Sequence, residues 1–196
     1  MKKRLAILIG ALCLATSALA EQGDWLVRLR AIDISPDASS SPVPGVDVDN
    51  KWAPEVDISY FITHNIALEL ILTYPQKHDV TLNGANIGTV KHLPPTLTLQ
   101  YHFAPKAGFR PYVGAGINYT RFSSVNLNAP PRLGTENSSV GWALQAGFDV
   151  PVARNMLFNV DVKKVKIETD LFTPAGYLTT LKIDPVIVGV GIGWSF

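Results

Sequence analysis

Four histidines are the residues of this sequence best suited to bind a metal ion, but they are spread widely along the chain. They are His64, His78, His92 and His102, and the single cysteine, Cys13, lies far upstream of all four. Zinc sites usually combine histidine and cysteine ligands at short, fixed spacings. No such spacing is present, so we predict that the protein binds no metal.

Two other segments contain parts of known binding motifs. The segment 47–50 (Asp-Val-Asp-Asn) supplies the first ligands of a calcium-binding loop, but the glycine and the distal glutamate of such a loop are missing. The alternating glycines from Gly189 to Gly193 lack the following helix that a dinucleotide site requires. The sequence also has no Gly-x-Ser-x-Gly nucleophile motif. We therefore predict neither an enzyme nor a cofactor-binding protein.

Charged and glycine residues stand at alternate positions inside otherwise apolar segments. The segment around Val140 sets Val140, Trp142, Leu144, Ala146, Phe148 and Val150 against Gly141, Ala143, Gln145, Gly147 and Asp149. The last segment sets Val186, Val188, Val190, Ile192, Trp194 and Phe196 against Gly189, Gly191, Gly193 and Ser195. A period of two is the signature of a β-strand whose two faces differ chemically. Strands must therefore position these side chains.

Eight segments of this kind can be placed along the chain, and their connections alternate between long and short. The segments lie near 24–35, 53–63, 65–77, 91–103, 110–122, 138–150, 155–168 and 182–196. The long connections lie near 36–52, 78–90, 123–137 and 169–181, and the short ones near 63–65, 104–109 and 151–154. Long extracellular loops and short periplasmic turns are typical of outer-membrane barrels. We predict an all-β protein, an eight-stranded antiparallel up-and-down transmembrane β-barrel, with both ends of the barrel domain at the periplasmic side.

A soluble β-barrel would also alternate, and the composition of the two faces argues against it. One face is apolar in nearly every segment and carries aromatic residues near the strand ends. The other face carries many glycines and the charged residues Arg28, Arg30, Glu55, Asp57, Glu69, Asp149, Asp161 and Lys163. A glycine-rich face on water-exposed strands would weaken the sheet and pack against nothing. The pattern favours a barrel whose apolar face contacts lipid.

The first twenty residues are typical of a cleaved secretory signal peptide. Three basic residues precede an apolar stretch, and Ala18 and Ala20 place small side chains before a cut at Glu21. The remaining residues, 21–196, suit one barrel domain. Without the three basic residues the count of Lys and Arg falls from 17 to 14, against 16 Asp and Glu. This balance gives no reason to expect a nucleic-acid partner.

Two motifs resemble those of a known family. The stretch 91–103 (Lys-His-Leu-Pro-Pro-Thr-Leu-Thr-Leu-Gln-Tyr-His-Phe) and the following stretch 110–120 (Arg-Pro-Tyr-Val-Gly-Ala-Gly-Ile-Asn-Tyr-Thr) are similar to the OmpW family of outer-membrane proteins. The Gly-x-Gly-x-Gly run and the terminal Trp194-Ser195-Phe196 resemble that family too. The resemblance implies an eight-stranded barrel in a Gram-negative outer membrane, with a narrow interior associated with uptake of small hydrophobic molecules. The final Phe196 resembles the signal that barrel-assembly machinery recognises.

The alternation predicts which side chains line the lumen. They are Arg28, Arg30, Asp57, Glu69, Gln100 and His102 on one wall, and Gly114, Gly116, Gly141, Gly147, Gly189 and Gly191 on the other. Two interpretations remain. The glycines leave a cavity lined by backbone, or they make room for long charged side chains that fill the periplasmic half as an ion network. Buried charges need partners, and both signs are present.

The extracellular half has fewer charges and three prolines. Apolar residues of the long loops, among them Val46, Leu133, Leu171 and Leu181, would form an apolar mouth or would pack as extensions of the strands. Pro75 ends the third segment, and Pro94 and Pro95 open the fourth. Proline donates no hydrogen bond to a ladder. These three residues predict a weakly paired lateral seam, although they would also serve simply to end strands.

Two functions follow from this reading. The first is a porin-like channel that passively admits small hydrophobic solutes and releases them sideways into the outer-membrane lipid. The alternative is a structural or adhesive barrel that conducts nothing and acts through its extracellular loops. The sequence leaves open the oligomeric state and the identity of any solute.

Overall fold

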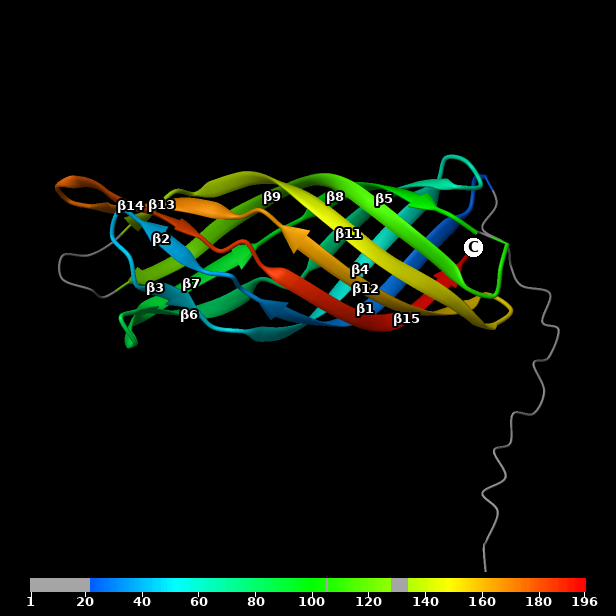
Figure 1. Cartoon of the computed structure of the whole chain (residues 1–196), viewed down its shortest axis with the longest axis horizontal. Coiled ribbons are helices and arrows are strands. Elements are labelled where there is room, and N and C mark those ends of the chain that lie inside the picture. The colour runs from blue at the N-terminus through cyan, green and yellow to red at the C-terminus, as the bar shows by residue number, and fades with distance from the viewer. Residues whose placement is uncertain (1–21, 105, 128–133) are drawn as a thin grey trace, which may run out of the picture.

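A closed antiparallel barrel forms the body of the molecule in the computed structural model, which describes residues 22–104, 106–127 and 134–196. Its eight strands, in order around the barrel, are β1 (Trp25–Ser35), β4 (Lys51–Phe61), β5 (Ile66–Thr73), β8 (Thr96–His102), β9 (Arg110–Leu127), β11 (Ser138–Ala153), β12 (Met156–Val165) and β15 (Val186–Ser195). Pairing of β9 with β11 and of β1 with β15 closes the ring. The predicted fold class is confirmed (Figure 1).

The barrel strands alternate between a buried inner face and an exposed outer face, as their period of two requires. In β4 the buried residues include Glu55, Asp57, Ser59 and Phe61, whereas Val56 and Tyr60, which alternate with them, are exposed. Aromatic rings gather toward both ends of the outer face. Trp25, Tyr60, Tyr101, Phe103 and Phe109 lie toward the end with the short turns, and Trp52, Tyr74 and Tyr119 lie toward the other end. Two such belts are typical of a barrel that spans a bilayer.

The third and fourth predicted strands are each broken in two, which corrects the sequence-based boundaries. The stretch 65–77 contains β5 and the start of β6 (Gln76–Leu82), and the stretch 91–103 contains the end of β7 (Ala85–Leu93) and β8. The breaks fall at Pro75 and at Pro94-Pro95. The missing amide hydrogen of proline interrupts a ladder, so one continuous strand becomes two.

The four long connections, predicted as loops, carry strands of their own. These are β2 (Ser39–Ser41), β3 (Val46–Val48), β6, β7, β10 (Gly134–Thr135), β13 (Glu168–Thr173) and β14 (Gly176–Lys182). The β6–β7 hairpin turns at Asn83 and Gly84, which both have positive φ angles, 50° and 80°. An Asn-Gly pair with this geometry is a strong local hairpin signal. The prediction of a loop at 78–90 is therefore wrong, because most of this stretch lies in β6 and β7.

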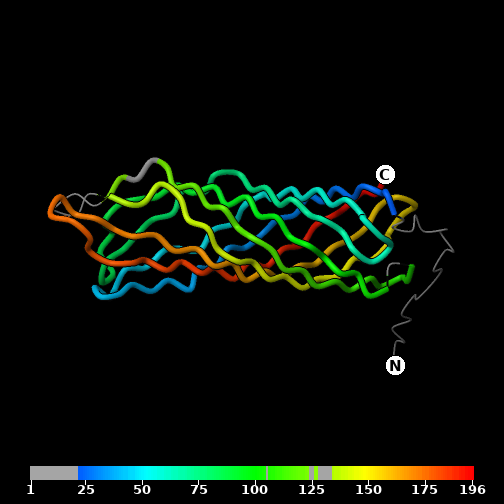
Figure 2. Tube along the Cα trace, turned by 90° about the horizontal axis from the view of Figure 1, so that it is seen from above, coloured from blue at the N-terminus to red at the C-terminus, as the bar shows by residue number. Residues whose placement is uncertain are grey.

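These additional strands form an extension beyond the extracellular end of the barrel. One part adds β7, β6 and β3 to the outer half of β9, and the other is a separate sheet in the order β10-β13-β14-β2. They surround an apolar core that includes Val46, Val80, Phe122, Leu171 and Leu181. Figure 2 shows the extension continuing the long axis of the barrel. The apolar loop residues therefore pack as strand extensions, although Leu133 lies outside the described residues.

The short turns and the C-terminus lie together at the other end of the barrel (Figure 1). There the amide of Trp25 donates to the carbonyl of Phe196 at 3.2 Å, and Phe196 donates back to Trp25 at 2.9 Å. Both ends of the described barrel thus lie at the periplasmic side. The expected signal peptide, residues 1–20, falls outside the described residues. Among the residues described, no helix has the length and hydropathy to cross a membrane.

Candidate functional site

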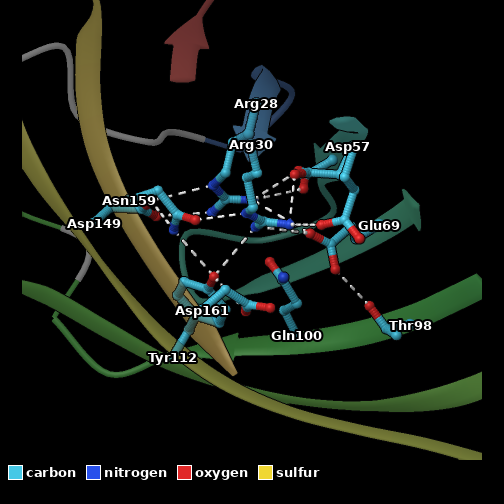
Figure 3. Close-up of polar contacts among 12 residues, drawn as sticks. Arg28, Arg30, Asp57, Glu69, Thr98, Gln100, Tyr112, Asp149, Asn159 and Asp161 are labelled. Atoms are coloured by element: carbon cyan, nitrogen blue, oxygen red, sulfur yellow. Dashed lines mark hydrogen bonds and ion pairs between the residues drawn. The ribbon is translucent and has the colours of Figure 1, made fainter. Parts of the chain in front are cut away.

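Arg28 is the centre of a network of ions inside the barrel. Its Nε and Nη2 atoms donate to the two carboxylate oxygens of Asp149 at 3.1 and 2.7 Å. Its Nη1 atom donates to Asp57 at 3.0 Å and lies 3.4 Å from Glu69. All four side chains are buried, and they come from β1, β4, β5 and β11 (Figure 3). One guanidinium therefore ties together strands from opposite walls.

Arg30 and Lys163 extend the network toward the extracellular side. Arg30 Nη1 lies 2.9 Å from Glu55 Oε1 and 2.8 Å from Asp57 Oδ2. Lys163 Nζ donates to Glu55 at 2.7 Å and to Asp161 at 2.8 Å. Alternate positions on β1, β4 and β12 all point inward, so their charged groups converge along the barrel axis.

Neutral polar side chains complete the hydrogen bonding of this network. Thr98 and Gln145 donate to Glu69 at 2.8 and 2.6 Å. The Tyr112 hydroxyl donates to Asp161 at 2.8 Å, and Asn159 donates to that hydroxyl at 3.1 Å. The sequence reading did not assign these four to the site. The alternation could have predicted them. Each stands an even number of residues from a predicted inward position on its own strand, so it lies on the same face.

The network closes the middle of the lumen. Buried charges are tolerated when they are paired and hydrogen-bonded, and the three cations Arg28, Arg30 and Lys163 all meet carboxylates here. Nearer the periplasm, the lumen is filled by an apolar cluster of Leu26, Phe61, Ala67 and Leu157. We call the ion network and this apolar cluster together the plug.

The inward glycines make room for the plug. A Cβ atom at Gly193 would lie 3.0 Å from the Arg28 side chain, and one at Gly147 would overlap the ring of Tyr112. Gly116 differs, because a Cβ atom there would overlap the backbone of Leu97 and Thr98 on the neighbouring wall strand rather than a side chain of the plug. Of the two interpretations of these glycines, the geometry of the periplasmic half matches the one in which they accommodate large side chains.

A narrow cavity lies directly above the plug, on its extracellular side. The Glu55–Lys163 ion pair bounds it on the plug side, and Thr73, Pro94 and Thr96 bound it on one wall. Most of the remaining lining is apolar: Ile32, Ile34, Ile71, Val165, Ile167, Pro185 and Ile187. The volume open to the centre of a water molecule is about 20 Å³. The cavity therefore has space for a water molecule, and a larger solute requires it to open.

The wall of this cavity contains a gap in the β-ladder. On one side Ile71 pairs with Thr96, and the next pair along the wall is Gln76 with His92. Residues 72–75 thus face residues 93–95 without a ladder pair between them. We call this gap, which contains Pro75, Pro94 and Pro95, the seam. It lies beside the cavity, which Thr73 and Pro94 help to line.

A second small apolar cavity lies inside the extension, and the ring of His92 lines both cavities. His92 stacks on His78 with ring centroids 4.7 Å apart. Burial, with a smaller effect of neighbouring His78, lowers the pKa of His92 to about 3. His78 Nδ1 lies 2.9 Å from the Asp49 carbonyl, while its Nε2 atom is buried without a hydrogen-bond partner. Burial also lowers the pKa of His78, so both rings are neutral near pH 7.

The structure places all of the predicted lumen residues on the inner face of the barrel. Gln100 and His102 are buried, with His102 Nε2 3.0 Å from Gln100 Oε1, and His102 packs on Phe61 at the periplasmic end. Gly141, farther out, lies against the backbone of Lys166. Within the described residues, no group of three or more His, Cys, Asp or Glu side chains is placed to hold a metal ion.

Comparison with known proteins identifies two relatives with similar sequences. The chain is 42% identical, over 88% of its length and 80% of the relative's, to the uncharacterized outer-membrane protein y4mB of Sinorhizobium fredii. It is 29% identical, over the full length of both chains, to the dibenzothiophene metabolism operon protein PahQ of Pseudomonas aeruginosa.

The fold and the family model agree with these relatives. The crystal structure of OprG from Pseudomonas aeruginosa matches with a TM-score of 0.78 and 27% identity, covering 90% of this chain and 97% of that one. The model of the OmpW family matches residues 21–196. The chain therefore belongs to the OmpW family of outer-membrane barrels.

Proposed function

We propose that this outer-membrane barrel passively admits small hydrophobic molecules, which enter the extension from outside and leave through the seam into the bilayer. The observation that carries the proposal is the position of the cavity. It lies above a plug of paired ions and beside the seam. A solute that reaches it meets charges on the periplasmic side and a gap in the ladder on the membrane side.

The chemistry of this route favours apolar solutes. The cavity lining is mainly aliphatic, and the outer half of the interior is built from the apolar core of the extension. Transfer of an apolar molecule from water into such surroundings is favourable without any energy source. The relative PahQ is named for an operon of dibenzothiophene metabolism. Dibenzothiophene is a compact apolar molecule, which is the class of solute that we propose.

Passage requires the seam to widen, because the cavity has space for little more than one water molecule. The carbonyls of Pro94 and Pro95 are already held by β9, where Asn118 Nδ2 lies 3.3 Å from each and the Tyr119 amide donates to Pro95 at 3.0 Å. The ring nitrogens of the prolines donate nothing to the facing strand. Valine at these two positions keeps both carbonyls and restores the backbone amide donors that a continuous ladder requires.

The test is uptake of an apolar fluorescent probe by lipid vesicles that contain the purified protein. We expect the Pro94→Val/Pro95→Val variant to fall toward the rate of vesicles without protein. Pro111→Val is the matched control, because Pro111 lies on β9 away from the seam, beside Phe148; its uptake should equal that of the original protein. An unchanged rate in the double variant would exclude the seam as the exit. If the original protein gives no faster uptake than empty vesicles, the structural or adhesive role remains.

A further inference from the structure

Three basic residues form a cluster on the outer surface of the extension, just beyond the seam. Lys77 on β6 and Lys91 on β7 are directly opposite each other in the ladder. Arg121 on β9 pairs with Leu93, two residues from Lys91, so it is the diagonal neighbour of that lysine. His78, His92 and Phe122, the next residues along each strand, are buried and point inward. The three cations therefore share the outward face.

This arrangement is unfavourable for the protein alone. Like charges directly opposite each other across two strands destabilise a sheet. Lys77, Lys91 and Arg121 form no salt bridge with any carboxylate of the described residues. The neighbouring Asp79 also points outward, but it lies two residues farther from the membrane along β6.

Three lysines at or just beyond the outer ends of other barrel strands, in contrast, have acidic partners. Lys51 Nζ lies 2.7 Å from Asp49, Lys164 lies 3.4 Å from Asp37, and Lys166 lies 3.3 Å from Glu168. Lys182 on β14 stands opposite Glu168 in its ladder, so the directly opposed like charges lie on the face formed by β6, β7 and β9. A concentration of like charge without a partner in the chain indicates a partner of opposite charge outside it.

The position of the cluster along the barrel axis, relative to the membrane, indicates which kind of partner it would bind. Tyr74 and Tyr119 are 66% and 50% exposed and belong to the outer aromatic belt, which marks the edge of the hydrocarbon region. Lys77 and Arg121 follow these tyrosines by three and two residues, so they lie about 7–10 Å farther along their strands. Lys91 Nζ lies 6.0 Å above the ring of Tyr74. The cations are therefore at the level of the lipid headgroups of the outer leaflet.

We propose that Lys77, Lys91 and Arg121 bind the phosphate groups of lipid A, the phosphorylated glycolipid anchor of the outer leaflet. A phosphate offers several acceptor oxygens, and both lysine and arginine bind it through charge-assisted hydrogen bonds. Its negative charge would relieve the repulsion between the two opposed lysines. The aromatic and aliphatic side chains below the cluster would contact the acyl chains of the same molecule. This site is separate from the proposed solute route and does not depend on it.

Lipid A binding by the purified protein in zwitterionic detergent micelles tests the site. The Lys77→Gln/Lys91→Gln/Arg121→Gln variant should bind diphosphorylated lipid A more weakly, by about fivefold per residue and roughly 100-fold in total. The matched control is Lys166→Gln/Lys182→Gln, which removes two lysines on another wall and should leave the affinity within about twofold. The charge-retaining variant Lys77→Arg/Lys91→Arg should bind as the original protein does.

Folding of the triple variant is not expected to suffer, because the substitutions remove repulsion. The single variant Lys91→Gln provides a milder version of the same test, with an expected loss of about fivefold. The site is wrong if dephosphorylated lipid A binds as tightly as the diphosphorylated form, or if the control pair loses as much affinity as the triple variant. Competition by inorganic phosphate at the same concentration would show a general anion site and would overturn the assignment to the glycolipid.

Discussion

Arg28 illustrates how single residues determine the interior of this barrel. Its side chain is completely buried, and its guanidinium contacts Asp149, Asp57 and Glu69. A buried ion pair gives little net stability compared with a well-packed apolar pair, because both charges lose their hydration. Removing only one partner is different, since the remaining charges are then buried and unpaired. Each charged residue of the network therefore depends on the others for its charge to be compensated inside the barrel.

The first residue-scale prediction concerns this dependence. Arg28→Met should lower the free energy of unfolding by about 3–5 kcal/mol, since three carboxylates lose a shared cation. Lys166→Met is the control, because the Lys166–Glu168 pair is 37% and 38% exposed and such pairs contribute at most about 1 kcal/mol. Urea unfolding of both variants in the same detergent measures the difference. Equal losses would mean that the ion network does not stabilise the barrel.

At the scale of elements, the β6–β7 hairpin has a turn with a favourable local sequence at one end and no ladder pairs beyond its other end. Its Asn83-Gly84 turn is local, whereas its base ends at the seam, where ladder pairing stops. Between them, the stacked rings of His78 and His92 fill the space beneath the hairpin. His92 also approaches Phe122 on β9, with ring centroids 6.5 Å apart. The two histidines thus hold the hairpin to the core in their neutral form.

Acid should therefore loosen this hairpin. The folded-state pKa of His92 is about 3, below the unfolded value of about 6.5. The open hairpin binds a proton between these values and the closed hairpin does not. Stability is therefore complete above pH 6.5 and falls by about 1.4 kcal/mol per unit as the pH decreases toward 3.

Hydrogen exchange of β6 and β7, corrected for the intrinsic effect of pH, would measure this opening. The variant His92→Phe keeps a ring against Phe122 but cannot be protonated, so its opening should depend less on pH. His64→Gln, in an exposed turn, should behave as the original protein does. The role of His92 is contradicted if His92→Phe retains the full acid dependence.

The sequence predicted elements where the pattern was regular and failed where local and long-range effects compete. Strict alternation in β1, β9, β11 and β15 was enough to place these strands and to assign Arg28 and Arg30 to the inner face. The prolines marked Pro75 and Pro94-Pro95 as strand boundaries, but the same pattern did not show that the chain would continue beyond them as β6 and β7, or that Asn83-Gly84 would form the turn between these two strands. It also did not show which inward residues would meet, because partners such as Tyr112 and Asp161 lie on strands far apart in the chain.

At the scale of the whole molecule, three layers follow one another along the barrel axis. The periplasmic end and the middle are filled by the plug, the cavity lies above it, and the apolar core of the extension closes the extracellular end. An eight-stranded barrel is just wide enough to be filled by its own side chains. The lumen is therefore packed along its axis, and the seam is a part of the barrel wall where ladder pairs are missing.

This arrangement predicts that polar solutes do not pass. In a liposome-swelling assay with a small sugar, vesicles that contain the protein should swell at less than about a tenth of the rate given by an open porin. The sugar cannot replace the paired ions of the plug or enter the apolar core. Vesicles with an equal amount of a 16-stranded porin are the positive control. Swelling at a comparable rate would show that a continuous aqueous path exists through the barrel.

The two edges of the seam are not mechanically equivalent. The edge at Pro94 and Pro95 is fixed to β9, an 18-residue strand that pairs with both β7 and β8 and so bridges the break between them. On the opposite edge, the β4–β5 ladder ends at Glu55–Thr73 and the β6–β7 ladder begins at Gln76, which leaves Tyr74 and Pro75 between two ladders. In the proposed exit, the edge at Tyr74 and Pro75 therefore has fewer ladder pairs to break than the edge at Pro94 and Pro95, and we expect the movement to occur there.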